Sequence, residues 1–463
     1  RTPWLPDLFF ACFSPYFRNT SSFKKLPFAL GNDKSYIGTL FLFSMGKTLS
    51  FLATIFFHKI TLNTSYLTFG ELISKLVLFF LTAIIARSLG ATQLGLFSFV
   101  YSLVTVFFIF SDFGINTLIN IDVVKNRTTA DKYLWNAQLI KLSLSFFSLF
   151  SLLLFAFLSN QEGIISYLIV TSIAFIFINL NNTYSSIFRA FERMDYEMIS
   201  RILKNSLFFF FSLYFIFIKS ILGIFYAFMI ANIIVFFFNR YFFKKIISRT
   251  ASFDLHFIKL LLKKSLPYAL TSLFVMIYLK SDVIILSLLN GTTISGTYVV
   301  ASEVLNALIL FPHFIGFSLF PLFSHYLKHQ PTLSVLFTET LKFQALLTAF
   351  ITLLFFMFSK YIIFLFFGKE YLDSALVLQI IIFAFLFIGI CIIYTYLYYI
   401  LGYEKKITII TAFVAVLNIL FNLILIPFYS LYGAAIATVI THIILALLCI
   451  FFIDKTNIMK NFF

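Results

Sequence analysis

Long apolar stretches alternate along the chain with short segments that are polar or contain Gly and Pro. Each stretch is about 20 residues long, which lets an α-helix cross a hydrocarbon core of about 30 Å. Helices also satisfy their own backbone hydrogen bonds, as a bilayer requires, and the stretches are too long for barrel strands. The pattern predicts an all-α polytopic membrane protein with about 12 transmembrane helices, at 66–88, 95–119, 134–158, 164–188, 202–219, 221–243, 266–288, 297–322, 338–366, 375–400, 407–427 and 432–453.

Composition agrees with a membrane location, because hydrophobic residues make up 61% of the chain, charged residues make up 11%, and the mean hydropathy is +1.01. A water-soluble globule would expose too much of that apolar surface. The three cysteines, Cys12, Cys391 and Cys449, are far apart and lack metal-ligand or redox-motif spacing. We expect them to fill apolar space, and we expect no disulfide framework, metal or cofactor.

Lysines and arginines divide unequally between the two sides when successive loops are assigned alternately. One side carries only Arg87, Lys219, Lys360 and Lys369, and the other side carries most of the rest. Cytoplasmic loops of membrane proteins are rich in Lys and Arg. We therefore expect a multi-pass protein of the cell (inner or plasma) membrane with both termini cytoplasmic. The net charge of +16 then reports topology and not nucleic-acid binding.

A short phrase occurs twice, as LGATQLGLFSF at 89–99 and LNGTTISGTYVV at 289–300. Gly90 and Gly95 recur 201 residues later as Gly291 and Gly296, at the outer end of the first two spans of each half. A second echo relates LGIFYAFMIANI, which enters span 6, to YGAAIATVITHI, which enters span 12. Each half has six spans, so we expect parallel repeats: two six-helix bundles around a central cavity.

The first 65 residues fit this scheme poorly, because charges interrupt their apolar runs and no full-length span is present. The chain opens with Arg1, and Met45 is an alternative start. The expected organisation is an ill-ordered segment or upstream extension at 1–65, an N-terminal bundle at 66–243, a basic cytoplasmic linker at 244–265, a C-terminal bundle at 266–453 and a cytoplasmic tail at 454–463.

Four stretches in order carry a resemblance to a known family: 86–102, 281–304, 367–371 and 426–438. The chain resembles the Wzx-type oligosaccharide flippases, which belong to the multidrug/oligosaccharidyl-lipid/polysaccharide exporter superfamily. The resemblance covers roughly residues 62–455 and implies a V-shaped pair of six-helix bundles. It also implies a polyprenyl-diphosphate-linked oligosaccharide as substrate, an O-antigen or other surface polysaccharide unit moved from the inner to the outer leaflet. Implied partners are the lipid bilayer and polysaccharide polymerase and ligase machinery.

Basic residues within the spans are candidates for binding the diphosphate, since a charge at the bilayer centre costs at least about 2.5 kcal/mol and marks function. Lys75 and Lys280 lie within about 5 Å of the middle of their spans, one in each bundle. We expect them jointly to neutralise the diphosphate, which carries about two negative charges. Arg189, at the inner mouth, is a candidate for substrate capture. Arg87 either draws the product outward or anchors its helix at the interface.

Two asparagines and a third lysine complete the set of substrate candidates. Asn116 belongs to a polar stripe on span 2 that includes Asp112, and Asn306 lies on a polar face of span 8. We expect both faces to line one aqueous vestibule, with Phe108 facing lipid. Lys141 in span 3 either contributes to the site or extends its ammonium group to the interface.

Acidic residues and one histidine are candidates for binding a coupling proton or sodium ion. Glu71 precedes Lys75 by four residues, so the two can form a local ion pair on one helix face. The same acids alternatively hold the lysines in place. The ion-coupling candidates are Glu71, Asp112, Asp282, Glu303 and His313, the last of which occupies the repeat position of Asp112.

Three other functions compete with the flippase. An ion-coupled multidrug exporter has the same architecture, but its cavity is expected to favour acids, whereas the deep charges here are mixed. A lipid II flippase usually has two more spans. A membrane glycosyltransferase or polymerase needs a catalytic acid and usually a large outer loop, and the sequence has no DxD, nucleophile elbow or zinc set. We therefore expect no catalytic residue and no enzyme activity.

Overall fold

The computed structural model describes residues 59–246, 253–328 and 330–454. Almost all of these residues are helical. The long helices are α3 (Lys59–Asp112), α4 (Ile115–Lys125), α5 (Ala130–Leu158), α6 (Ile165–Ala190), α7 (Met194–Phe217), α8 (Ile221–Ile246), α9 (Leu255–Asn290), α10 (Thr292–Leu308), α11 (Leu310–His325), α12 (Gln330–Phe367), α13 (Ser374–Ile400) and α14 (Glu404–Asp454). Short 3₁₀ turns at Arg127–Thr129, Glu162–Ile164, Tyr326–Lys328 and Lys369–Tyr371 connect some of them.

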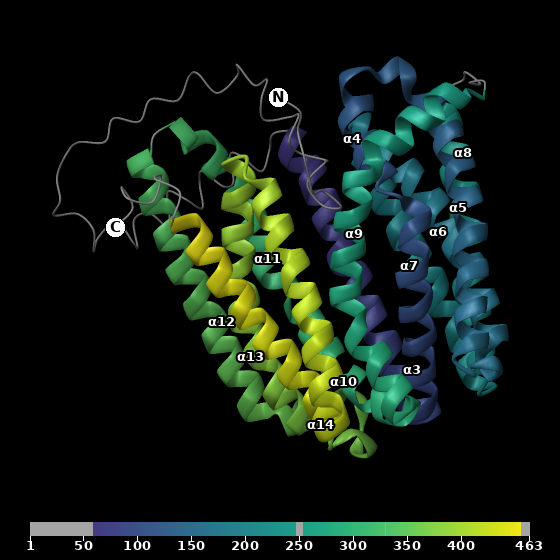
Figure 1. The fold of residues 1–463 in the computed structure, drawn as a ribbon, viewed down its shortest axis with the longest axis vertical. Helices are drawn as coiled ribbons and strands as arrows, with labels where there is room; N and C mark the ends of the chain where they lie inside the picture. The colour runs from purple at the N-terminus through teal and green to yellow at the C-terminus, as the bar shows by residue number, and fades with distance from the viewer. Residues whose placement is uncertain (1–58, 247–252, 329, 455–463) are drawn as a thin grey trace.

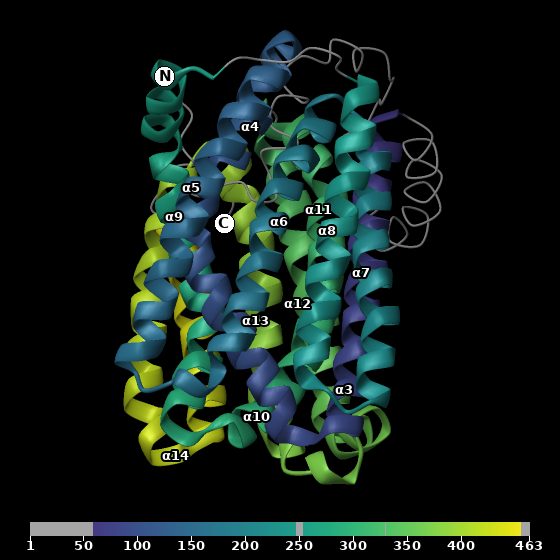
Figure 2. The same cartoon turned by 90° about the vertical axis from the view of Figure 1, so that its right-hand side faces the viewer.

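The predicted number of membrane crossings agrees with these helices. Ten helical stretches in the described ranges are long and apolar enough to span a membrane. Two of them contain a non-helical residue, Gly90 in α3 and Ser430 in α14, with a span-length helix on each side. Counting those halves separately gives the twelve spans, and all helices run along the long axis of the molecule (Figures 1 and 2).

The two predicted bundles are confirmed, and they share one apolar core at one end. Helices α4–α8 form one half and α11–α14 the other, and the halves converge where α3, α10 and α14 make their glycine and serine turns (Figure 1). We call this the glycine end and the opposite one the basic end. One apolar core at the glycine end combines residues of both halves, such as Val100 and Val300. Toward the basic end there are two separate cores. One lies around Tyr184 in the N-terminal half and also includes Leu261 and Tyr268 of α9, and the other lies around Tyr398 in the C-terminal half.

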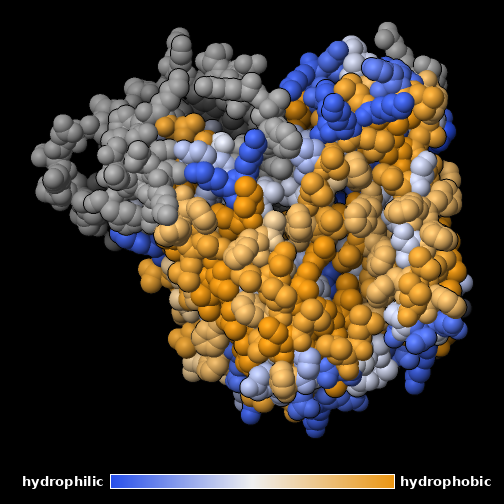
Figure 3. All heavy atoms as spheres, viewed as in Figure 1, coloured by the Kyte–Doolittle hydropathy of each residue, from blue (hydrophilic) through white to orange (hydrophobic). Residues whose placement is uncertain are grey.

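The outer surface has the hydropathy of a membrane protein. Apolar residues cover the middle of the molecule, and hydrophilic residues gather at the two ends (Figure 3). Phe150, Phe217 and Phe428 are 66%, 85% and 80% exposed, which is unfavourable in water but favourable against lipid. Much of the high phenylalanine content therefore covers surface and does not form core.

Two predicted domain boundaries differ from the helices. Helix α3 begins at Lys59, so residues 59–65 are helical, whereas residues 1–58 and the tail at 455–463 lie outside the described residues. Helix α9 begins at Leu255, inside the predicted linker, because the Asp254 side chain caps it by accepting a hydrogen bond from the Phe257 amide at 3.0 Å. Lys132 of α5 pairs with Asp254 at 2.7 Å and fixes this helix start on the N-terminal bundle.

The predicted span 2 is two helices. Phe113 and Gly114 have φ of 47° and 67°, which separates α3 from α4. A Cβ on Gly114 would lie 2.5 Å from Cβ of Tyr268, so α9 packs closely against this break. The break puts Asp112 and Asn116 on separate helices, and the Asn116 amide still donates a hydrogen bond to Asp112 across it.

Candidate functional site

A cavity of about 400 Å³ lies between the two bundles. Its polar lining comes from α3, α7, α9, α10 and α14, so both halves contribute. The charged and asparagine residues that line it are Lys204, Asn205, Lys280, Asp282, Glu303, Asn306 and Asn418. A recess between the halves with hydrophilic residues at its floor is visible on the surface (Figure 3). A polar cavity enclosed by apolar helices is the usual form of a transport site.

Glu303 is an acid that acts electrostatically on both of the lysines that were expected to bind the diphosphate. Its carboxylate interacts electrostatically with both Lys280 and Lys75, and its side chain also hydrogen-bonds Asn306. The Lys280 ammonium lies 5.4 Å from the centre of the Tyr101 ring, which provides a cation–π contact from the opposite bundle. Lys75 lies beside the cavity and 4.0 Å from Glu71, so the predicted local ion pair forms.

Asp282 is the centre of a buried polar cluster in the C-terminal bundle. Its carboxylate accepts hydrogen bonds from Asn422 at 2.6 Å, from Thr438 at 2.7 Å and from Tyr298 at 3.0 Å. All three donors are neutral, and no Lys or Arg of the described ranges lies within 4 Å of the carboxylate. The carbonyl oxygen of Asn418 accepts from Ser281 at 2.6 Å, beside this group. We call Asp282, Asn418, Asn422 and Thr438 the Asp282 cluster.

The Asp282 cluster has the chemistry of a cation site. It gathers carboxylate, amide and hydroxyl oxygens, which are the ligands that hard cations prefer. The amide oxygen of Asn422 is buried and has no hydrogen-bond partner among the described residues. A cation or a proton would neutralise the carboxylate, whose burial is otherwise costly.

The N-terminal bundle contains a second buried cluster, around Asp112. The Lys141 ammonium donates to Asp112 at 2.8 Å, to Asn116 at 2.6 Å and to the carbonyl of Asn179 at 3.2 Å. The Lys141 side chain is 0% exposed, so it does not extend to the interface as one alternative required. Because all three ammonium hydrogens have acceptors, this cluster is complete without a ligand. Asp112, Asn116 and Lys141 are not among the residues that line the cavity, whereas Asn306 is.

Ion pairs link α3, α6 and α7 toward the basic end. Arg189 of α6 donates to Glu197 of α7 at 2.5 Å. Arg201 pairs with Glu197 at 3.0 Å and also with Glu71 of α3. Arg189 and Glu71, two of the predicted site residues, therefore belong to one network of ion pairs that continues to Lys75.

The doubled phrase forms the contact between the bundles at the glycine end. Gly90 and Gly291, with φ of 80° and 87°, make the turns. Gly95 and Gly296 instead allow two helices to touch, because a Cβ on Gly95 would lie 1.7 Å from the carbonyl oxygen of Thr292. The hydroxyls of Thr92 and Thr293 lie 2.8 Å apart. We call Thr92, Gly95, Thr293 and Gly296 the glycine seam.

Arg87 lies near the glycine seam and bridges the two halves. Its guanidinium donates to the carbonyls of Phe364, at 3.2 Å, and of Leu365, in the last turn of α12. A cation in this position hydrogen-bonds carbonyls at the end of a helix and complements the helix dipole. The hydroxyl of Tyr371 donates back to the carbonyl of Ala86 at 3.0 Å. The observed contacts of Arg87 therefore hold this end together.

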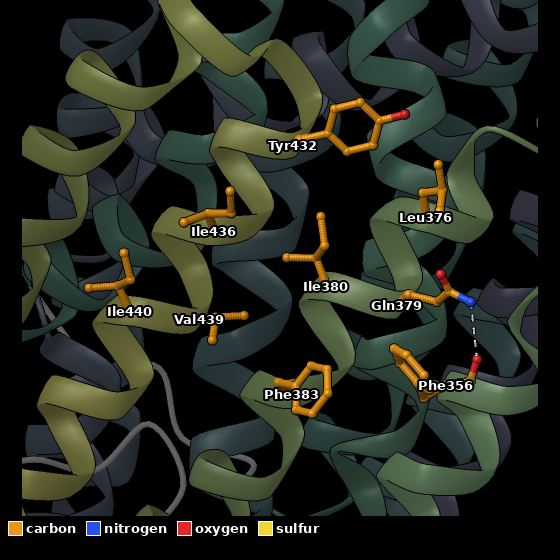
Figure 4. Close-up of a pocket in the computed structure, with 9 residues that line it drawn as sticks. All are labelled: Phe356, Leu376, Gln379, Ile380, Phe383, Tyr432, Ile436, Val439 and Ile440. Atoms are coloured by element: carbon orange, nitrogen blue, oxygen red, sulfur yellow. Dashed lines mark hydrogen bonds between the residues drawn. The ribbon is translucent and has the colours of Figure 1, made fainter.

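An apolar groove of about 550 Å³ lies on α12, α13 and α14 (Figure 4). Phe356, Phe383, Ile436 and Ile440 are among the side chains that line it, and no charged residue does. The amide of Gln379 donates to the carbonyl of Phe356 at 3.3 Å. A phosphate would find no counter-charge there, so the cavity between the bundles is the candidate site for a charged group.

Sequence reasoning identified part of this site. Lys280, Asp282, Glu303 and Asn306 all line the cavity as candidates, and His313 on α11 interacts electrostatically with Lys75. The missed residues are Lys204, Asn418, Asn422 and Thr438. The two asparagines are four residues apart in a strongly apolar span, a spacing that places both on one helix face and was the available signal.

Comparison with known proteins gives a family match. The model of the polysaccharide biosynthesis protein family matches residues 60–327. An uncharacterized membrane protein of Methanocaldococcus jannaschii is 25% identical over 314 residues, which are 65% of this chain and 61% of that protein. The chain therefore spans less than two thirds of the length of this curated relative.

Solved structures with the same fold are transporters of the MOP superfamily. The lipid II flippase MurJ, in an inward closed conformation, superposes with a TM-score of 0.69 at 18% identity, covering 85% of this chain and 89% of MurJ. An inward-facing multidrug resistance MATE family transporter superposes with a TM-score of 0.66 at 16% identity, covering 85% of this chain and 95% of the transporter. At these identities the similarity establishes the fold.

Proposed function

The chain belongs to the polysaccharide biosynthesis protein family, and on that premise we propose that it is a flippase for a polyprenyl-diphosphate-linked oligosaccharide. The substrate moves from the inner to the outer leaflet of the cell membrane by alternating access. The observation that carries the proposal is the cavity between the bundles, where Lys280 and Glu303 line a polar space inside an apolar shell.

The lysines supply the charge that a diphosphate needs. Lys280 comes from the C-terminal bundle and Lys75 from the N-terminal bundle, and Glu303 interacts with both. A shared carboxylate offsets the positive charges while the cavity is empty of substrate. An entering diphosphate competes with Glu303 for the same cations, which allows binding that is strong enough to capture and reversible enough to release.

The Asp282 cluster supports coupling to an ion. Its carboxylate lines the same cavity as Lys280, which lies two residues away on α9. A sodium ion or proton bound at Asp282 changes the charge of the cavity and hence its affinity for the diphosphate. Ion entry and substrate release are in this way linked through one helix.

The arrangement of the bundles supports alternating access. The halves share a core at the glycine end. Toward the basic end there are two separate cores, and the first part of α9 packs into the N-terminal one. The distribution of Lys and Arg supports a cytoplasmic position for the basic end. We interpret this conformation as inward-facing, with the glycine seam closed on the outer side.

Purified protein in proteoliposomes with a fluorescent polyprenyl-diphosphate oligosaccharide tests the proposal, with bleaching of the exposed leaflet as the readout. Lys75→Gln and Lys280→Gln are expected to slow translocation at least about tenfold, and Lys→Arg to retain more activity, because charge is what binds the diphosphate. Lys342→Gln is the matched control, since Lys342 is 63% exposed and pairs with Glu339.

Two results would contradict this assignment. Wild-type rates in both glutamine variants at normal abundance would exclude the two lysines from the site. Transport of a cationic dye by the wild-type protein, without movement of the lipid-linked sugar, would favour the multidrug exporter instead. If Lys75→Gln lowers the amount of protein in the membrane and leaves the transport rate per molecule unchanged, Lys75 chiefly stabilises the protein through its pair with Glu71.

A further inference from the structure

Lys204 lines the cavity, although it was expected only to contribute to the side of the membrane that is rich in Lys and Arg. It lies on α7 of the N-terminal bundle and lines the cavity together with Lys280 of α9. Its side chain is partly buried. Each bundle therefore contributes one lysine directly to the cavity wall.

Lys204 differs from Lys75, Lys141 and Lys280 in that no acid of the described residues acts on it, whereas Glu303 acts electrostatically on Lys280. Lys141 pairs with Asp112 at 2.8 Å, and Lys75 lies 4.0 Å from Glu71. Within the described ranges no carboxylate lies within 4 Å of the Lys204 ammonium. The charged group that acts on it is Arg201, three residues earlier on α7, and that group has the same sign.

An ammonium group inside a membrane cavity has lost much of its favourable hydration. It therefore needs a counter-charge to offset that cost. Arg201 does not provide one, because it is a cation that is itself paired with Glu71 and Glu197. The missing counter-charge is therefore an anion that enters the cavity. A neutral sugar would leave the ammonium uncompensated, whereas a phosphate oxygen would both accept its hydrogen bonds and balance its charge.

We propose that Lys204 binds one phosphate of the lipid diphosphate from the N-terminal side of the cavity, while Lys280 binds the other phosphate from the C-terminal side. This assignment rests on the proposed flippase function and specifies where the head group lies. Lys204 and Lys280 then contact the phosphates directly from the cavity wall, while Lys75, whose charge Glu71 and Glu303 partly offset, adds to the positive charge beside the cavity. A diphosphate held between one lysine of each bundle draws the bundles together.

Chemical restoration of the charge tests Lys204. In a background with Cys12, Cys391 and Cys449 replaced by alanine, Lys204→Cys is expected to weaken binding of farnesyl diphosphate to purified protein at least about tenfold. Reaction with aminoethyl methanethiosulfonate restores an ammonium and should restore binding. Methyl methanethiosulfonate, which adds a neutral group at the same sulfur, should not. Farnesol, which lacks the phosphates, is the matched control ligand. Its binding should be the same to the unreacted Lys204→Cys protein and to the protein after either reagent.

The outcomes separate the two proposals. Two outcomes would overturn the role of Lys204. In one, Lys204→Cys binds farnesyl diphosphate as tightly as its cysteine-free parent; in the other, the neutral reagent restores binding as well as the charged one. Lys280→Gln would still lose binding in that case, and the flippase proposal would stand. Wild-type protein that binds no farnesyl diphosphate would overturn both. Because both reagents act on one folded preparation, a folding defect cannot imitate the expected pattern.

Discussion

Asp112 and Asp282 are carboxylates of nearly equal burial, 7% and 8% exposed, but the two bundles stabilise them differently. In the N-terminal bundle the Lys141 ammonium lies 2.8 Å from Asp112. In the C-terminal bundle Asp282 accepts hydrogen bonds from Tyr298, Thr438 and an asparagine, all neutral. One carboxylate has a permanent counter-ion, and the other has none within 4 Å in the part of the chain that the structure describes.

We interpret this difference as the one between a structural acid and a functional acid. A buried ion pair that also satisfies its hydrogen bonds is neutral and needs no ligand. A buried carboxylate with neutral donors keeps a charge that a proton or a mobile cation must balance. We infer that the Asp112 cluster fixes the N-terminal helices, whereas the Asp282 cluster binds the coupling ion. Asp112 thus illustrates that an intramembrane charge marks a function only when its partner is not already part of the chain.

The largest expected effect comes from Asp282→Asn. The amide keeps much of the shape and accepts some of the same hydrogen bonds, but it removes the charge that attracts a cation. Translocation should fall at least about tenfold and lose its dependence on a sodium or proton gradient. Rates in proteoliposomes with and without each gradient provide the measurement, and Glu339→Gln, at an exposed acid, is the control. Retained gradient dependence would remove Asp282 from the coupling site.

Asp112→Asn is expected to destabilise the protein instead, since it leaves Lys141 as a buried charge without its carboxylate. Breaking a buried pair costs about 3–5 kcal/mol. The double variant Asp112→Asn, Lys141→Met removes both charges and should recover much of the loss. Thermal unfolding in detergent measures both. A single variant as stable as the wild type would show that the ion pair does not hold the bundle together.

Thr438→Val should have a smaller effect on the C-terminal site. It removes one hydrogen-bond donor to Asp282 while the carboxylate and the asparagines remain, so ion affinity should change by roughly tenfold or less. Thr183→Val is the matched variant in the N-terminal bundle, where the hydroxyl donates to the carbonyl of Asn179 at 3.1 Å. The ion dependence of transport should respond to the first substitution and not to the second.

Single cysteines test the accessibility of the two regions with the least disturbance of transport. Asn306 lines the cavity, so a cysteine in its place should react with a water-soluble thiol reagent. Asn116→Cys should react slowly, because Asn116 is 7% exposed and bonded to Lys141. Labelling rates on intact proteoliposomes decide this. Equal rates at both positions would mean that water reaches the Asp112 cluster as freely as the cavity.

The sequence predicted the spans and the repeat well, because both depend on patterns along the chain. Gly95 and Gly296 were recognised as repeat mates, yet their direct contact required the relative position of two helices. Phe108, which was expected to face lipid, is 2% exposed, since a helical wheel cannot distinguish lipid from an apolar neighbour.

The site was predictable only in part for the same reason. Lys280 and Glu303 stand out as charges in apolar spans, whereas Lys204 lies at the start of the predicted span 202–219, just after other basic residues, and was counted with them. Asp112 and Lys141, 29 residues apart, form a pair that no local rule connects. A charge in a span indicates that a partner is needed, but three-dimensional packing decides whether the partner is a side chain or a ligand.

The glycine seam gives the most direct test of the central claim, that the two bundles must separate at this end to release a lipid-linked substrate. The hydroxyl oxygens of Thr92 and Thr293 lie 2.8 Å apart, which suits a disulfide between Thr92→Cys and Thr293→Cys. In the cysteine-free background, oxidation of this pair should abolish translocation of the fluorescent polyprenyl-diphosphate oligosaccharide, and reduction should restore it. Each single cysteine should transport normally under both conditions. A cross-linked protein that translocates at the rate of the reduced one would contradict the account.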